Sequence, residues 1–182
     1  IPVFSLRSKH SFGVGEFADI RLMVDWAAQT GQSIIQILPI NDTTMTGTWQ
    51  DSYPYNANST FALHPQFLHL PAVGKLKNKA EMERFEALGK ELNELPMIDY
   101  ERVNNAKAEY LHKIFEQDGA KTLASKEFKA FLADNEEWLR PYAIFCALRD
   151  EKGTPDFSQW GKMATYSKAK ATKYEKEHSD AV

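Results

Sequence analysis

The sequence has little cysteine and no long apolar run. Its 182 residues contain a single cysteine, Cys146, so no intramolecular disulfide can form. Cys146 lies in the apolar pattern of an expected helix, which favours a buried, inert thiol and a cytoplasmic protein. No apolar run approaches the ~20 residues of a membrane helix, and the N-terminal stretch IPVFSLRS does not resemble a secretion signal. We therefore expect no membrane partner. Because an initiator methionine is also lacking, we expect a processed or excised piece of a protein.

The sequence also lacks an excess of positive charge and any complete cofactor motif. It has 22 Lys and Arg against 25 Asp and Glu, a net charge of −3, which argues against a nucleic-acid partner. No histidine or cysteine pair has zinc-ligand spacing, so no metal is expected. Gly13 and Gly15 begin a pattern typical of phosphate loops, but Ala18 stands where the third glycine should be. The pattern favours a tight turn between a strand and a helix, and no cofactor is expected.

The first part of the chain predicts an α/β fold. Residues 3–6 and 33–40 are apolar runs with strand character. Between them, from residue 17, apolar side chains recur at helical spacing, and Gly31 follows as a helix cap. The second run is apolar on both faces, as parallel strands covered by helices tend to be. Strand, helix and strand in this order predict a right-handed parallel crossover.

The second part predicts helices only. From about residue 78 the sequence is rich in Lys and Glu and keeps a helical period up to Gly153, and residues 167–178 favour a solvated helix. We therefore expect residues 1–74 to form a first βαβ unit with a long loop, and residues 75–182 to form a helical subdomain. The expected helix N-caps are Asn78, Asp99, Ser125 and Asn135, with Pro141 near the first turn of the last of these helices.

A polar, aromatic loop follows the second predicted strand. The stretch DSYPYNANSTFALHP comes directly after IIQILPIND. Tyr53 and Tyr55 offer flat apolar faces with polar tips that suit a sugar ring, while Asp51 and Ser52 could hydrogen-bond its hydroxyls. In parallel α/β folds ligands lie beyond the carboxyl ends of strands, where this loop would lie. The same aromatics could instead pin a structural loop, and composition leaves both interpretations open. Asp42 is the other carboxylate near the loop, but its proximity in sequence does not establish a glycosidase pair.

The motifs around this loop resemble those of a known family. LPIND followed by TWQDSYPYNANSTFALHP is similar to the amylomaltases, the 4-α-glucanotransferases or disproportionating enzymes of glycoside hydrolase family 77. IPVFSLRS, SFGVGEFADI, IDYERVNNAK and EEWLRPYAIFCALRDEKG carry the resemblance through nearly the whole chain. The sequence departs from the family motif in the extra Tyr53 between Ser52 and Pro54, and in His64 before Pro65. The resemblance implies the N-terminal part of a (β/α)8 barrel, with its first two parallel strands and an α-helical insertion.

The resemblance also implies an activity and site residues. The family cleaves an α-1,4-glucan with retention and passes the glucosyl chain to another sugar, so maltooligosaccharides are the expected partners. Tyr55 matches the tyrosine that stacks on the sugar near the scissile bond, and Ser52 the serine beside it. Asp51 occupies the acidic position before that serine, whereas Tyr53 has no counterpart in the shorter motif. The family's catalytic carboxylates belong to later strands, so no catalytic residue is expected here and the chain alone is expected to be inactive.

Two other functions remain open at this point. The parent protein could be an α-glucan hydrolase of related barrel type, or the chain could be a non-catalytic module that binds glucan or another protein. In either case, two parallel strands with open edges make a poor domain. We therefore expect the isolated piece to self-associate.

Overall fold

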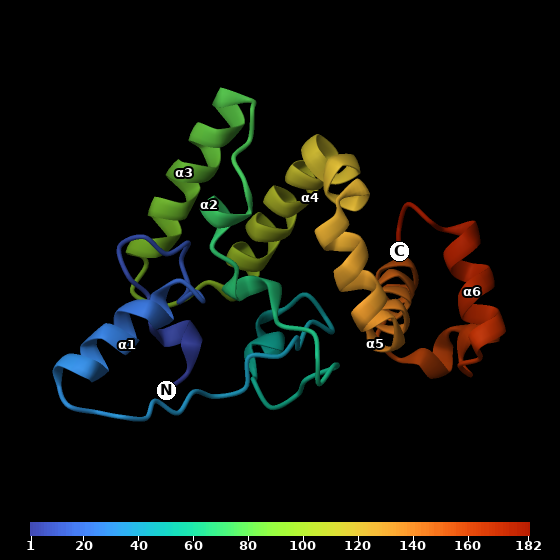
Figure 1. Ribbon diagram of the computed structural model, residues 1–182, viewed down its shortest axis with the longest axis horizontal. Coiled ribbons are helices and arrows are strands. Elements are labelled where there is room, and N and C mark those ends of the chain that lie inside the picture. The colour runs from blue at the N-terminus through green and yellow to red at the C-terminus, as the bar shows by residue number, and fades with distance from the viewer.

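The computed structural model describes all 182 residues, and helices dominate it (Figure 1). The α-helices are α1 Asp19–Gln29, α2 Leu70–Val73, α3 Lys79–Glu94, α4 Tyr100–Ala124, α5 Lys126–Lys152 and α6 Lys168–Glu177. Single 3-10 turns are η1 Val3–Ser5, η2 Trp49–Ser52, η3 Pro65–Phe67, η4 Phe157–Gln159 and η5 Gly161–Met163. In Figure 1 the chain runs from α1 and α3 on the left, through α4, to α5 and α6 on the right. None of the helices is both long enough and apolar enough to span a bilayer.

The α/β fold class predicted from the sequence is wrong, because the structure contains no sheet. Residues 3–5 of the first predicted strand form the 3-10 turn η1 instead. Residues 33–40, the second predicted strand, are an irregular segment along the lower edge of Figure 1. The only β-type pairing is an isolated antiparallel bridge between Asn41 and Leu63. The two parallel strands of a (β/α)8 barrel are therefore not formed.

The physical reason is that few other parts of the chain cover residues 33–40. The amino group of Ile1 donates to the carbonyl of Gln36 at 2.6 Å, and the N–H of Leu38 donates to the carbonyl of Ile1 at 3.0 Å. A two-stranded pairing is marginal in water, and parallel strands are stable mainly where both faces are buried. Ile34 is 83% exposed, so packing does not compensate for the missing partner strands. The apolar sequence alone is not sufficient to form a strand.

The helix predicted between these segments is confirmed as α1. It ends at Gln29, and Gly31 follows as the expected cap with a φ of +73°, in the left-handed region. The N–H of Gly31 donates to the carbonyl of Ala28, and the N–H of Gln32 donates to that of Ala27, which is the Schellman arrangement. Much of the apolar surface of α1 is nevertheless exposed, at Leu22, Val24 and Trp26.

Most predicted helix ends in the second part are also confirmed. Gly153, at φ +64°, ends α5, and the expected helix in residues 167–178 is α6. In three N-caps a side-chain oxygen accepts a backbone N–H two or three residues into the helix: Asn78 from Glu81, Asp99 from Arg102, and Ser125 from Phe128. These ends could be predicted because each depends on residues a few positions apart.

The predicted helix start at Asn135 is wrong. Helix α5 runs without a break through Asn135 and Pro141, so the proline lies in its interior rather than near a first turn. The side-chain amide of Asn135 donates to the carbonyl of Phe131 at 2.8 Å, and its oxygen accepts from the indole N–H of Trp138 at 2.8 Å. These partners within the helix occupy the side chain that was expected to cap a new one.

The apolar core is divided into three clusters instead of one. The first cluster joins α5, the turns after it and α6. The second joins α2, α3 and α4. The third joins the turn before α1, which contains Val14, to α3 and α4. Their buried members are, in this order, Ile144, Leu148, Trp160, Ala171 and Tyr174; Leu70, Leu76, Phe85 and Tyr110; and Val14, Leu92 and Val103. None of these buried members comes from the loop after residue 40, which contacts α5 through polar groups and through Phe61, stacked on Trp138 with ring centroids 5.5 Å apart.

A buried ion pair joins α4 to the N-terminal region. The ammonium group of Lys107 donates to a Glu16 carboxylate oxygen at 2.6 Å and to the carbonyls of Gln66 and Leu68 at 2.7 and 2.8 Å. Both charged side chains are 1% exposed. Burial lowers the pKa of Lys107, although the Glu16 carboxylate opposes this effect. The contacts cross from residues 1–74 to residues 75–182, and the division of the chain at this point stays a prediction.

The glycine-rich stretch before α1 is a turn made tight by backbone contact. Gly13 has a φ of +75°, and the N–H of Gly15 donates to the carbonyl of Phe4 at 2.9 Å. A Cβ on Gly15 would lie 2.0 Å from the carbonyl oxygen of Val3. Glycine is thus needed here for close backbone approach. The turn predicted between a strand and a helix lies instead between η1 and α1.

Candidate functional site

The candidate site is the loop between residues 41 and 65, and its two ends are held together. The N–H of Asp42 donates to the carbonyl of Ala62 at 2.9 Å, and the N–H of His64 donates to that of Ile40 at 3.0 Å. Between these ends the 3-10 turn η2 is capped by the hydroxyl of Thr48, which accepts from the N–H of Gln50. These hydrogen bonds close the loop at its base, and Tyr53 and Tyr55 lie between its two ends in the sequence.

Asp51 points into this loop. It is buried, and its carboxylate accepts hydrogen bonds from the backbone N–H groups of Met45, Thr46 and Gly47 at 2.8–3.2 Å. The Thr46 hydroxyl donates to the same carboxylate at 3.0 Å, and the Thr43 hydroxyl donates to the Asp51 carbonyl. The side chain proposed from sequence as a sugar contact therefore binds consecutive amides of its own loop.

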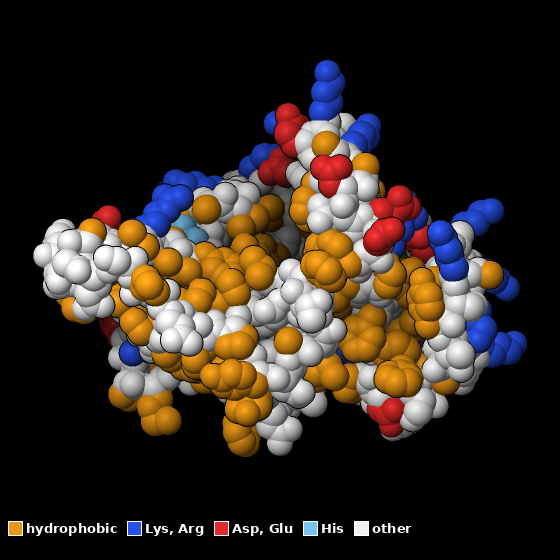
Figure 2. All heavy atoms as spheres, turned by 60° about the horizontal axis from the view of Figure 1, so that its bottom comes forward, with side chains coloured by type: hydrophobic (Ala, Val, Ile, Leu, Met, Phe, Trp, Pro, Cys, Tyr) orange, Lys and Arg blue, Asp and Glu red, His pale blue; other side chains and the backbone are white.

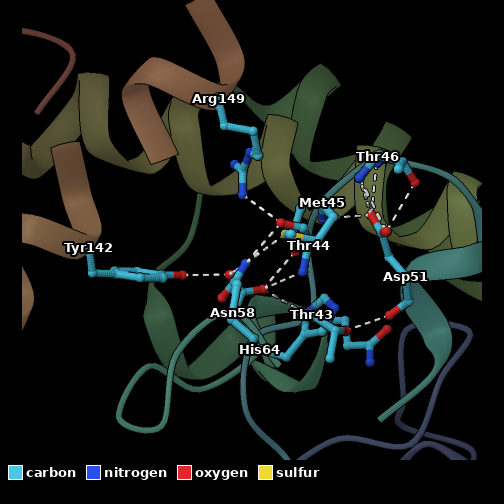
Figure 3. Close-up of polar contacts among 12 residues, drawn as sticks. Thr43, Thr44, Met45, Thr46, Asp51, Asn58, His64, Tyr142 and Arg149 are labelled. Carbon is cyan, nitrogen blue, oxygen red and sulfur yellow. Dashed lines mark hydrogen bonds and ion pairs between the residues drawn. The ribbon is translucent and has the colours of Figure 1, made fainter. Parts of the chain in front are cut away.

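Asp42 joins the two arms of the loop to each other and to α5, and Figure 3 labels its partners Thr44, Asn58 and Tyr142. Its carboxylate accepts from the N–H and hydroxyl of Thr44 at 3.0 and 2.7 Å, from the amide of Asn58 at 3.1 Å, and from the hydroxyl of Tyr142 at 2.6 Å. Burial raises the pKa of Asp42, but hydrogen bonds from Thr44 and Tyr142 outweigh that effect and hold the pKa below its usual value. The carboxylate is an ionised structural centre without a free oxygen for catalysis.

Two further residues support this centre. The guanidinium group of Arg149 donates to the carbonyl of Thr44 at 2.7 Å, where the amide of Asn58 also donates at 2.9 Å. Nδ1 of the buried His64 accepts from the N–H of Gln66 at 3.2 Å and lies 4.0 Å from Asp42. Burial lowers the pKa of His64 despite the nearby carboxylate, so the imidazole is neutral at pH 7. His64, which departs from the expected motif, thus caps η3 from a position beside Asp42.

Tyr53 and Tyr55 lie on the outside of the loop. Each is 61% exposed, and their ring centroids are 5.6 Å apart with planes inclined at 55°. Ser52, between Asp51 and the tyrosines, is half-buried. The structure therefore presents the two aromatic rings together on the surface, whereas the carboxylate of Asp51 binds amides inside the loop.

Comparison with known proteins decides the family. A family model described as 4-alpha-glucanotransferase matches residues 1–182. The chain belongs to the 4-alpha-glucanotransferase family. It is 44% identical to 4-alpha-glucanotransferase DPE2 of Oryza sativa subsp. japonica over 185 residues, and 35% identical to a 4-alpha-glucanotransferase of Chlamydia caviae over 184 residues. These alignments cover 100% and 99% of this chain but 20% and 33% of the two relatives.

A third relative of the family shows similar identity and coverage. The 4-alpha-glucanotransferase of Chlamydia muridarum is 34% identical over 169 residues, which cover 91% of this chain and 31% of the relative. The chain therefore spans between a fifth and a third of the length of these 4-alpha-glucanotransferases. The resemblance noted in the loop motifs is confirmed by these matches.

The contacts of this 4-alpha-glucanotransferase chain include residues that sequence reasoning missed. Tyr142 and Arg149 were not predicted to belong to the site, yet both contact the loop. Asn58 and Thr44 were not predicted to belong to the site. Tyr142 lies 100 positions from Asp42, and Arg149 lies 105 from Thr44, so no local spacing connects them. The sequence offers no signal that identifies these partners.

Proposed function

We propose that the complete protein transfers α-1,4-glucan segments between maltodextrins with retention, and that this chain supplies part of its glucan-contacting wall. The observation that carries this proposal is the exposed pair Tyr53 and Tyr55 on a loop braced from inside. Membership of the 4-alpha-glucanotransferase family supports the substrate class. A pyranose ring has an apolar C–H face with hydroxyls at its rim, which suits aromatic rings next to a serine hydroxyl.

The proposed roles of the four loop residues differ. Tyr55 stacks on the sugar, Tyr53 extends the aromatic surface, and Ser52 hydrogen-bonds a sugar hydroxyl. Asp51 stabilises the loop and does not contact the sugar in this proposal, because its carboxylate already accepts hydrogen bonds from the amides of residues 45–47. Maltooligosaccharides are the proposed partners, and the proposed transfer requires no cofactor.

We assign the bond-breaking groups to residues outside this chain. Retaining transfer requires one carboxylate as nucleophile and another as acid and base. Asp42 and Asp51 are both buried, and hydrogen bonds within the loop and from α5 occupy their oxygens. The 182-residue chain alone is therefore proposed to be inactive.

The first experiment compares the full-length enzyme with the 182-residue chain. Each is incubated with maltotriose, and the products are resolved by length. We expect glucose together with dextrins longer than maltotriose from the full-length enzyme, and no product from the short chain. Shortening alone would favour a hydrolase, whereas binding without any change in length would favour a non-catalytic module.

In the same assay Tyr55→Ala tests the aromatic surface. Loss of the stacking contact is expected to raise KM about tenfold, which corresponds to roughly 1.4 kcal/mol. Tyr166→Ala is the matched control, because Tyr166 is 64% exposed but lies outside the loop. Equal KM values for the two variants would contradict a sugar contact at Tyr55.

We also propose that the isolated 182-residue chain self-associates. Figure 2 brings the lower side of Figure 1 forward and shows apolar side chains spread over it. The segment containing Ile34 and the side chains of Leu22 and Trp26 on α1 are exposed apolar surface, which favours association. Light scattering is expected to give a mass above 20.8 kDa that rises with concentration. Ile34→Lys should reduce this rise more than Met97→Lys, a control at another exposed apolar position, and a constant 20.8 kDa would contradict the proposal.

A further inference from the structure

Helix α5 contacts the loop through Trp138, which stacks on Phe61 with ring centroids 5.5 Å apart, and through two polar side chains that lie two turns apart on one face. Tyr142 donates from its hydroxyl to the carboxylate of Asp42 at 2.6 Å, and Arg149 donates to the carbonyl of Thr44 at 2.7 Å (Figure 3). A separation of seven residues places both on the same side of an α-helix. The helix therefore forms hydrogen bonds with the loop at two neighbouring points.

These two points lie at the base of the segment that carries the tyrosine pair. The N–H of Asn58 donates to the carbonyl of Asp42 at 2.9 Å, and its side-chain amide bridges the Asp42 carboxylate and the carbonyl of Thr44. Residues 42–44 form one arm of the loop and Asn58 belongs to the other, with residues 52–55 between them. Movement of either arm against α5 would change the direction in which Tyr53 and Tyr55 face.

We propose that Tyr142 and Arg149 are positioning residues for glucan binding, which hold both arms of the loop against α5 and so set the orientation of Tyr53 and Tyr55. This inference rests on the proposed function and goes beyond it by assigning a role to the helical part of the chain. Neither residue contacts the sugar in this proposal, because both are engaged by the base of the loop.

The expected kinetic effect follows from the cost of ordering a loosened loop. Without the Tyr142 hydroxyl, the buried Asp42 carboxylate loses one of its donors, and the loop samples more orientations before glucan binds. Binding then has to order the loop, which weakens affinity. Since the bond-breaking groups are not moved, KM rises while kcat is retained.

Tyr142→Phe in the full-length enzyme tests the proposal. The phenyl ring retains the packing on Trp138, whose centroid is 6.3 Å away, and only the hydroxyl is lost. We expect KM for maltodextrin to rise about five- to tenfold and kcat to change by less than about twofold. Tyr174→Phe is the matched control, because Tyr174 donates to the Glu151 carboxylate at 2.8 Å away from the loop. Its KM is expected to be unchanged.

The pH dependence of KM distinguishes a positioning role of Tyr142 from a general loss of stability. The titratable groups that face Asp42 are the hydroxyl of Tyr142, the guanidinium group of Arg149, the thiol of Cys146 and the buried imidazole of His64. Because the pKa of Asp42 is lowered in the folded protein, its hold on the loop is present above that pKa and is lost as pH falls through it. Tyr142→Phe removes a contact that lowers this pKa, so the rise in KM on acidification should begin at a higher pH than in the wild type.

Arg149 and a double variant complete the test. Arg149→Met should raise KM, and Arg149→Lys, which keeps a cationic donor, should recover part of the loss. Because Tyr142 acts through Asp42, Tyr142→Phe combined with Asp42→Asn should raise KM by less than the product of the two single effects. A lower melting temperature of Tyr142→Phe with unchanged KM and pH profile would overturn the proposal. Absence of transfer by the wild-type enzyme would instead overturn the proposed function.

Discussion

Lys107→Met is expected to lower the free energy of unfolding of the chain by about 3–5 kcal/mol. Lys107 is buried, and its ammonium group donates to the Glu16 carboxylate and to two backbone carbonyls of the segment 66–68. Methionine fills similar space but leaves the buried Glu16 carboxylate without its lysine partner, with only the imidazole of His69 at 2.6 Å beside it. It also leaves the two carbonyls short of a donor, and unsatisfied buried groups of this kind are costly.

Urea unfolding followed by circular dichroism measures this loss, with all variants at one protein concentration. Lys79→Met is the control, because Lys79 pairs with Glu83 at 3.7 Å on the solvent-exposed side of α3. An exposed pair of this type contributes at most about 1 kcal/mol. Adding Glu16→Gln to Lys107→Met removes the buried charge and should restore part of the stability. A loss no larger than that of Lys79→Met would show that the buried pair does not hold α4 to the N-terminal turn.

Gly15→Ala is expected to destabilise the chain by about 3 kcal/mol or more. The added Cβ would lie 2.0 Å from the carbonyl oxygen of Val3 and 2.8 Å from the backbone nitrogen of Leu6. Both atoms belong to the main chain, so neither can be relieved by a change of side-chain rotamer. The hydrogen bond from Gly15 to Phe4 would be strained as the two backbone segments separate.

Gly31→Ala is the control for this substitution. No atom lies within 4 Å of a Cβ built on Gly31, but its φ of +73° is unfavourable for alanine. We expect a loss of about 1 kcal/mol from this conformation alone. If urea unfolding gave equal losses for the two variants, close backbone approach at Gly15 would not be the dominant effect.

The candidate site could be located from the sequence but not assembled from it. The crowding of tyrosines and polar residues after LPIND indicated the loop, and the structure presents Tyr53 and Tyr55 together on its surface. The inward direction of Asp51 could not be foreseen, because it depends on the N–H groups of residues 45–47 converging on one carboxylate. The contact between Asp42 and Tyr142 was equally hidden, since it joins segments 100 residues apart.

The fold shows the same division between local and distant interactions. The cap of α1 at Gly31 and the cap of α4 at Asp99 were predicted correctly, because each requires hydrogen bonds within a few residues. The predicted strand at 33–40 was wrong, because a strand requires partner strands and covered faces that its own sequence cannot supply.

The sequence by itself determined the family motifs, most helix ends and the aromatic loop, all of which are properties of short segments. Only the tertiary structure decided that no sheet forms, that Lys107 is buried against Glu16, and that α5 holds the loop through Tyr142. The physical reason is that burial and ion pairing depend on groups brought together from distant parts of the chain. Helix caps depend on neighbours that the sequence already places side by side.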